Sequence, residues 1–150
     1  DYNKLLQKIN ALIENPDDRD AKLLRICALL EEEIPHFDWV GFYLVDPTTP
    51  RQLILGPYVG APTEHTQIPF GKGICGQAAD RETTFVIQDV SAETNYLLCS
   101  PDVQSEIVVP ITKESEVLGE LDIDSHALAP FTDDDRAFLE EVCDRVATLL

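Results

Sequence analysis

Four cysteines are the residues of this sequence best suited to covalent chemistry, and their surroundings differ. Cys27 and Cys143 lie in apolar stripes at helical spacing, which is typical of buried, inert thiols. Cys75 stands in a glycine-rich run, where the short helix that follows would offer amides and a dipole that favour a thiolate. Cys99 stands in a long stretch without periodicity, and such loops often carry reactive groups. The local pattern leaves Cys75 and Cys99 open as either reactive or idle thiols.

Carboxylates form a second group with chemical potential. Glu120, Asp122 and Asp124 alternate with apolar residues, so period two places all three on one face of a predicted strand. Glu106 opens the preceding predicted strand and would join them if the two strands pair. A converging cluster would bind a cation or hold a proton with a raised pKa. The alternative is a solvated acidic face, which is common in so acidic a chain.

Aromatic and histidine residues complete the set of candidates. Trp39 and Tyr43 are four residues apart, so we expect them on the same strand face, either in the core or as the wall of a small apolar pocket. The three histidines, His36, His65 and His126, have no metal-ligand spacing to another His or Cys. We therefore predict no metal site from the sequence.

The elements that must position these residues alternate between helical and extended patterns. Apolar residues recur at helical spacing in residues 5–13 and 23–34, and Pro35 stops the second helix. Strands are predicted at 39–45, 52–55, 66–70, 84–90, 107–112 and 117–123, with a short helix over 74–81 and a loop over 91–104. Thr132 and Asp135 predict a capped C-terminal helix. Successive hairpins favour an α+β fold with helices packed on a central antiparallel sheet, formed by a single domain over residues 1–150.

Composition narrows the classes of function. Eleven Lys plus Arg against 28 Asp plus Glu give a formal charge of −17, which repels nucleic acid and anionic lipid surfaces. No apolar stretch reaches the roughly 18 residues that span a bilayer, and the first residues do not have the pattern of a signal peptide. We expect a cytoplasmic protein with reduced thiols and with no nucleic-acid or membrane partner.

Several motifs, taken in order, resemble the GAF-fold free methionine-R-sulfoxide reductases. The matching segments are DWVGFY (38–43), LGP (55–57), IPFGKGICG (68–76), SEIVVP (105–110), GELDIDS (119–125) and FTD (131–133). The match extends from Trp39 to the C-terminal helix. The combination of motifs is far more specific than any one of them, so the resemblance implies a GAF-like domain and reduction of free methionine-R-sulfoxide to methionine.

The resemblance also implies a role for each matching position. Cys99 falls where the family has its catalytic cysteine, and Cys75 where it has a cysteine that takes part in disulfide exchange. Glu106, Asp122 and Asp124 match carboxylates that line the substrate pocket, while Trp39 and Tyr43 match its aromatic residues. One departure concerns recycling, because His65 stands where the family commonly has a further cysteine that resolves the oxidised catalytic one.

A mechanism follows from these roles. A Cys99 thiolate would attack the sulfoxide sulfur while protonated Glu106 hydrogen-bonds the leaving oxygen, giving methionine and a sulfenic acid. A second thiol, for which Cys75 is the best internal candidate, would form a disulfide, and an external dithiol such as thioredoxin would reduce it with no other cofactor. Two alternatives stay open at this point: a non-catalytic GAF module that binds a small ligand, and a thiol redox sensor. A homodimer is a further expectation from the resemblance.

Overall fold

The computed structural model describes residues 1–98 and 100–150. Cys99, the predicted attacking thiol, lies outside the described residues. The helices are α1 (Tyr2–Glu14), α2 (Arg19–Glu33), α3 (Gly73–Arg81) and α4 (Asp133–Val146), and the short 3₁₀ turns are η1 (Val90–Ala92) and η2 (Ala147–Leu149). The strands are β1 (Trp39–Val45), β2 (Gln52–Val59), β3 (Gln67–Pro69), β4 (Phe85–Ile87), β5 (Ser105–Lys113) and β6 (Glu116–Ser125).

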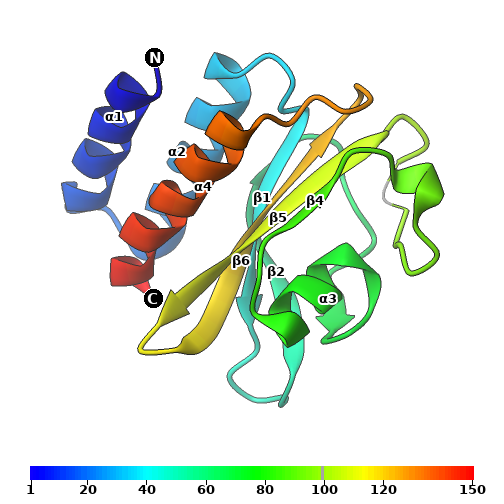
Figure 1. Cartoon of the computed structure of the whole chain (residues 1–150). Helices are drawn as coiled ribbons and strands as arrows, with labels where there is room; N and C mark the ends of the chain where they lie inside the picture. Colours follow the sequence, from blue (N-terminus) through cyan, green and yellow to red (C-terminus); the bar gives the residue numbers. More distant parts are fainter. Residues whose placement is uncertain (99) are drawn as a thin grey trace.

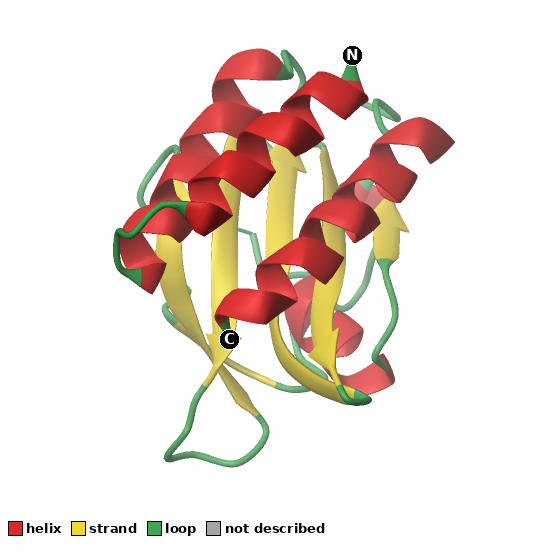
Figure 2. Cartoon of the chain, turned by 90° about the vertical axis from the view of Figure 1, so that its left-hand side faces the viewer, coloured by secondary structure: helices red, strands yellow, loops and turns green. Residues whose placement is uncertain are grey.

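The six strands form one sheet in the order β3-β2-β1-β6-β5-β4, and every neighbouring pair is antiparallel. Helices α1, α2 and α4 lie on one side of this sheet and α3 lies on the other (Figure 1). Figure 2 views the molecule from the side of the three long helices, which cross in front of the strands. This arrangement confirms the predicted α+β class.

The sheet separates two apolar cores because successive side chains of a strand point to opposite faces. The core under the long helices takes Val40, Phe42, Leu121 and Ile123 from the central strands. The second core, between the sheet and α3, includes Trp39, Tyr43, Ile74, Cys75 and Val108. Alternate residues of the central strands β1 and β6 therefore pack in the core under the long helices. The intervening residues face α3.

Local sequence signals explain most helix boundaries. Asp18 begins α2 by accepting a hydrogen bond from the Ala21 amide, and α2 ends one residue before Ile34, ahead of Pro35. Thr132 and Asp135 form the predicted capping box at the start of α4. None of the helices among the described residues is both long enough and apolar enough to span a membrane.

Two strand predictions were wrong in extent. Strand β2 continues to Val59 instead of ending at residue 55, because a bulge opposite Gly41–Tyr43 absorbs the Gly56-Pro57 pair and pairing then resumes. The strand predicted over 84–90 is only three residues long. It ends early because the Asp89 side chain accepts a hydrogen bond from the Ser91 amide and begins η1.

Candidate active site

Three rows of residues run across β1, β6 and β5 on the α3 side of the sheet. Asp124 pairs with Trp39 on β1 and with Glu106 on β5. Asp122 lies between Gly41 and Val108, and Glu120 lies between Tyr43 and Pro110. The register thus brings together the carboxylates that the sequence pattern placed on one strand face, and β5 supplies Glu106 as predicted.

The carboxylates are buried, which excludes a solvated acidic face. Glu106 is 5% exposed, Asp122 and Asp124 are 2% exposed, and Glu120 is fully buried. Burial raises the pKa of Asp122, and hydrogen bonds with Glu106 and Cys75 offset this in part. Burial and the charge of Asp122 raise the pKa of Asp124 well above its usual range, again offset in part by Glu106. Buried carboxyl groups this close together favour a shared proton over a full set of negative charges.

Cys75 faces the same cluster from the first turn of α3. Its Sγ donates to Glu106 Oε2 over 3.9 Å, and its side chain is 5% exposed. Burial raises the pKa of the Cys75 thiol well above its usual value, and Asp122, Glu120 and Glu106 raise it further. The expectation that the start of the short helix favours a thiolate here was therefore wrong, because nearby carboxylates outweigh the helix amides. Cys75 is a protonated thiol beside an acidic cluster.

The cavity at this cluster is nearly closed. It measures about 10 Å³, and its lining residues are Tyr43, His65, Ile68, Ile74, Cys75, Leu97, Glu106 and Asp122. A cavity of about 90 Å³ lies next to Trp39 and Asp124, and Ser100, Asp102 and Val103 form part of its wall. Both are far smaller than the roughly 300–1,000 Å³ of ordinary ligand pockets. A ligand the size of an amino acid would enter only if the segments that line these two cavities moved.

The two aromatic residues are held firmly on the site face. The Trp39 indole donates to the Ala61 carbonyl over 2.9 Å and stacks on Tyr58 at 5.3 Å. The Trp39 ring lies directly over Gly41, where an added Cβ would come within 2.4 Å of the ring. Gly41 is thus a positioning residue that sequence reasoning missed, although a glycine inside a strand is a signal of close approach.

Residues before the Cys99 position are fastened to α3 through Asn95. The Asn95 side chain accepts from the Gly73 amide and donates to the Gly71 carbonyl, each over 2.8 Å. Leu97 packs where a side chain on Gly73 would otherwise lie, and His65 Nε2 is 3.0 Å from the Leu98 carbonyl. Sequence reasoning missed Asn95, because its partners are distant along the chain.

Replacing Asn95 with alanine removes both of these hydrogen bonds. We expect amide hydrogen exchange at Gly73 and across residues 93–98 to become about 10-fold faster, since a net loss of roughly 1.4 kcal/mol fits two hydrogen bonds of which one is exposed and one is partly buried. Asn95→Asp keeps the acceptor for Gly73 and should fall between the two proteins. Unchanged exchange in Asn95→Ala would show that the segment is held by other contacts.

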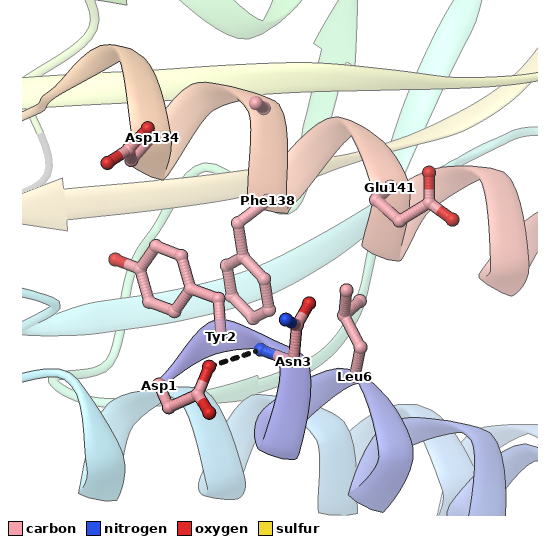
Figure 3. Close-up of a pocket in the computed structure, with 8 residues that line it drawn as sticks. Asp1, Tyr2, Asn3, Leu6, Asp134, Phe138 and Glu141 are labelled. Atoms are coloured by element: carbon pink, nitrogen blue, oxygen red, sulfur yellow. Dashed lines mark hydrogen bonds between the residues drawn. The ribbon is translucent and has the colours of Figure 1, made fainter.

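A wider hollow of about 550 Å³ lies on the other side of the sheet, between α1 and α4. Its walls are shown in Figure 3, with Tyr2 stacked on Phe138 and Asp1 capping the start of α1. Its lining residues include no cysteine, and its acidic residues Asp1, Asp134 and Glu141 are exposed. It lacks the nucleophile and the buried charge cluster of the α3 side, so we place the candidate site at Cys75, Glu106, Asp122 and Asp124.

The arrangement of helices, antiparallel sheet and buried site defines a GAF domain, and the GAF domain family matches residues 18–150. Among curated proteins, the free methionine-R-sulfoxide reductase of Escherichia coli is 34% identical over 149 residues, covering 99% of this chain and 88% of that protein. The chain belongs to the family of GAF-fold free methionine-R-sulfoxide reductases.

Two solved structures support the same assignment. One is the free methionine-R-sulfoxide reductase of Neisseria meningitidis in complex with its substrate, with a TM-score of 0.92 and 38% identity. The alignment covers 99% of this chain and 87% of that one. The type II free methionine-R-sulfoxide reductase of Thermoplasma acidophilum aligns with a TM-score of 0.83 and 37% identity, covering 87% of this chain and 91% of that one. The resemblance predicted from the sequence motifs is confirmed at the level of the family.

Proposed function

We propose that this chain reduces free methionine-R-sulfoxide to methionine, with Cys99 as the attacking thiol. The observation that carries the proposal is the buried cluster of Glu106, Asp122 and Asp124, which faces Cys75. Reduction of a sulfoxide needs a proton for the oxygen that leaves, and this cluster is a proton donor shielded from water. Relatives at 34–38% identity named for this activity support the same reaction.

The chemical step transfers the sulfoxide oxygen to sulfur. The Cys99 thiolate attacks the sulfoxide sulfur while a carboxyl of the cluster, with Glu106 as the candidate, donates a proton to the oxygen. The attack forms an S–S bond to the substrate. The protonated oxygen then passes from the substrate sulfur to the Cys99 sulfur as that S–S bond breaks, so methionine leaves and Cys99 ends as a sulfenic acid. Sulfur in the substrate is reduced and sulfur in the enzyme is oxidised, so the electrons balance.

Substrate recognition uses the same face. Asp122 and Asp124 would pair with the α-ammonium group, whose positive charge favours their ionised form. Trp39 and Tyr43 would surround the S-methyl group, because both rings lie on this face and are buried. A site that closes over the whole ligand would exclude methionine within a peptide.

Regeneration requires a second thiol. Cys75 would condense with the Cys99 sulfenic acid, forming a disulfide and releasing water. A thioredoxin-type dithiol would then reduce that disulfide, and no further cofactor is needed. His65 occupies the place of the extra family cysteine and holds the Leu98 carbonyl instead. Recycling therefore depends on Cys75 in this chain.

The test is methionine release with dithiothreitol as reductant, measured on the R and S epimers of free methionine sulfoxide and on a peptide containing the R epimer. We expect turnover on the free R epimer and at least about 100-fold less on the other two, since each presents groups that a closed site cannot pair. Tight binding of the free R epimer without turnover would instead identify a ligand-binding GAF module. Disulfide formation with oxidants but no methionine release would identify a redox sensor.

A further inference from the structure

The acidic cluster and Cys75 together have the geometry of a metal site. The ligand atoms of Cys75, Glu106 and Asp122 all lie within 4.8 Å of one another, and all three side chains are buried. We propose that, when Cys75 is reduced, these three residues bind one thiophilic divalent cation of the Zn²⁺ class. We further propose that the bound cation keeps substrate out; this part rests on the proposed function.

Distances among the donor atoms are close to those that zinc requires. Zinc–sulfur bonds of about 2.3 Å and zinc–oxygen bonds of about 2.0 Å in a tetrahedron put donor atoms roughly 3.5 Å apart. Cys75 Sγ and Glu106 Oε2 are already 3.9 Å apart. The other pairs lie within 4.8 Å, so rotamer adjustments of at most roughly 1.3 Å would bring three ligands into place, and the fourth position would remain for water or another donor.

A second observation points to a missing cation. Among the described residues, Asp122 Oδ1 is buried and has no hydrogen-bond partner. Both carboxyl oxygens of Glu120, two residues earlier on the same strand face, are also buried without a hydrogen-bond partner. Buried polar atoms are ordinarily satisfied, so unpartnered oxygens on the face that carries a thiol need an explanation. A divalent cation would satisfy Asp122 and neutralise part of the negative charge that these side chains concentrate in the interior.

The donor set selects the type of metal. Magnesium and calcium favour all-oxygen shells of six or more ligands, and this site offers too few oxygens in too small a space. A thiolate favours zinc and similar soft ions, and coordination displaces the thiol proton. The spacing of His and Cys residues along the chain predicted no metal site, although the carboxylate pattern was compatible with a bound cation. The fold joins residues 75, 106 and 122 instead.

Competition with substrate follows from shared residues. Glu106 and Asp122 are the groups proposed to act on methionine sulfoxide, and a cation that occupies them would take their charge. Cys75 must be a free thiol for the metal to bind, so a disulfide involving Cys75 would release it. Zinc would therefore inhibit the reduced enzyme only, and a chelator would restore activity.

Binding is tested on the reduced, chelator-treated full chain by titrating Zn²⁺ against a chromophoric indicator. We expect one Zn²⁺ per chain, and we expect Cys75→Ser to weaken binding by roughly 100-fold or more, beyond the 10- to 100-fold cost of losing an outer-shell partner. Asp122→Asn should also weaken it. Cys27→Ala removes a buried thiol far from the cluster and should leave the affinity unchanged.

The absorption spectrum of bound Co²⁺ tests directly whether a thiolate is a metal ligand, without a comparison of affinities. Co²⁺ in the wild type should show a thiolate-to-metal charge-transfer band that disappears in Cys75→Ser and persists in Cys27→Ala. Thermal unfolding without metal checks that each variant is folded. A band that persists in Cys75→Ser, or no Zn²⁺ binding by the reduced wild type, overturns the metal site.

The two proposals fail separately. Turnover without zinc binding would overturn the metal site and leave the reductase in place. Zinc binding without turnover would overturn the reductase and leave the metal site. If zinc binds and does not slow methionine release in a single turnover of the pre-reduced enzyme, measured without dithiothreitol because that dithiol chelates zinc, the exclusion of substrate is overturned.

Discussion

Replacing Cys99 with serine is expected to reduce methionine release from free methionine-R-sulfoxide by at least about 10³-fold, the scale of losing a covalent nucleophile. A serine hydroxyl is not ionised near neutral pH, so it cannot attack the sulfoxide sulfur as a thiolate does. The variant should keep its substrate affinity, since the carboxylates and aromatic residues that would contact the substrate are unchanged. Methionine release is measured in single-turnover and steady-state assays.

The Cys75→Ser variant separates attack from recycling. With dithiothreitol, a small dithiol that can reach the sulfenic acid directly, we expect it to keep a substantial part of wild-type turnover. With thioredoxin it should lose about 10-fold or more, because no internal disulfide is presented. Cys143→Ala is a control for the loss of a buried thiol, since Cys143 packs in the other core. Full turnover of Cys99→Ser would remove Cys99 from the mechanism and make Cys75 the next candidate.

Replacing Glu120 with leucine is expected to stabilise the protein. Glu120 is fully buried, and neither of its carboxyl oxygens has a hydrogen-bond partner among the described residues. Leucine has a similar size and removes both unsatisfied oxygens, whose burial costs roughly 1–3 kcal/mol. An increase of about 2 kcal/mol in the free energy of unfolding would raise Tm by roughly 4–8 °C in a chain of this length.

The stabilisation should grow with pH. Burial and the nearby Asp122 raise the pKa of Glu120 well above its usual range, while Cys75 lowers it in part. The native state therefore binds more protons than the unfolded state at pH values above about 4.3, the unperturbed pKa of glutamate, so stability falls as pH rises toward the folded pKa. Glu120→Leu removes this contribution, and its advantage should be larger at pH 8.5 than at pH 5.5.

Urea unfolding at the two pH values measures this difference. Glu116→Leu is the matched control, because Glu116 lies on the same strand and is exposed. It should change the free energy of unfolding by less than about 0.5 kcal/mol. A Glu120→Leu protein that is less stable than the wild type would mean that the carboxyl has partners the described contacts do not include.

Periodicity in the sequence was sufficient for those parts of the site that depend on strand geometry alone. Period two placed Asp122 and Asp124 on one face, and the hairpin pattern predicted that β5 would bring Glu106 beside them. Trp39 and Tyr43 share a face for the same reason. These predictions held because alternation is a local property of an extended chain.

Other properties depend on contacts between distant segments. The high pKa of Cys75 comes from burial and from carboxylates on β5 and β6, whereas the sequence pattern offered only its local helix. The link from Asn95 to Gly71 and Gly73 joins a loop to a helix more than twenty residues away. The spacing of residues along the chain predicts neither the pKa of Cys75 nor the hydrogen bonds of Asn95, because contacts between distant segments produce no periodic pattern in the sequence.

The division of β6 between the two faces of the sheet also bears on how the chain folds to one structure. A shift of one residue in the pairing of β6 would turn Glu120, Asp122 and Asp124 toward the apolar core under α2 and α4, and would turn Leu121 and Ile123 toward Cys75. Three carboxyl groups would then lie among the apolar side chains of that core, away from Glu106 and Cys75. Glu120, Asp122 and Asp124 thus destabilise the misaligned sheet far more than the native one. They favour the native strand register during folding.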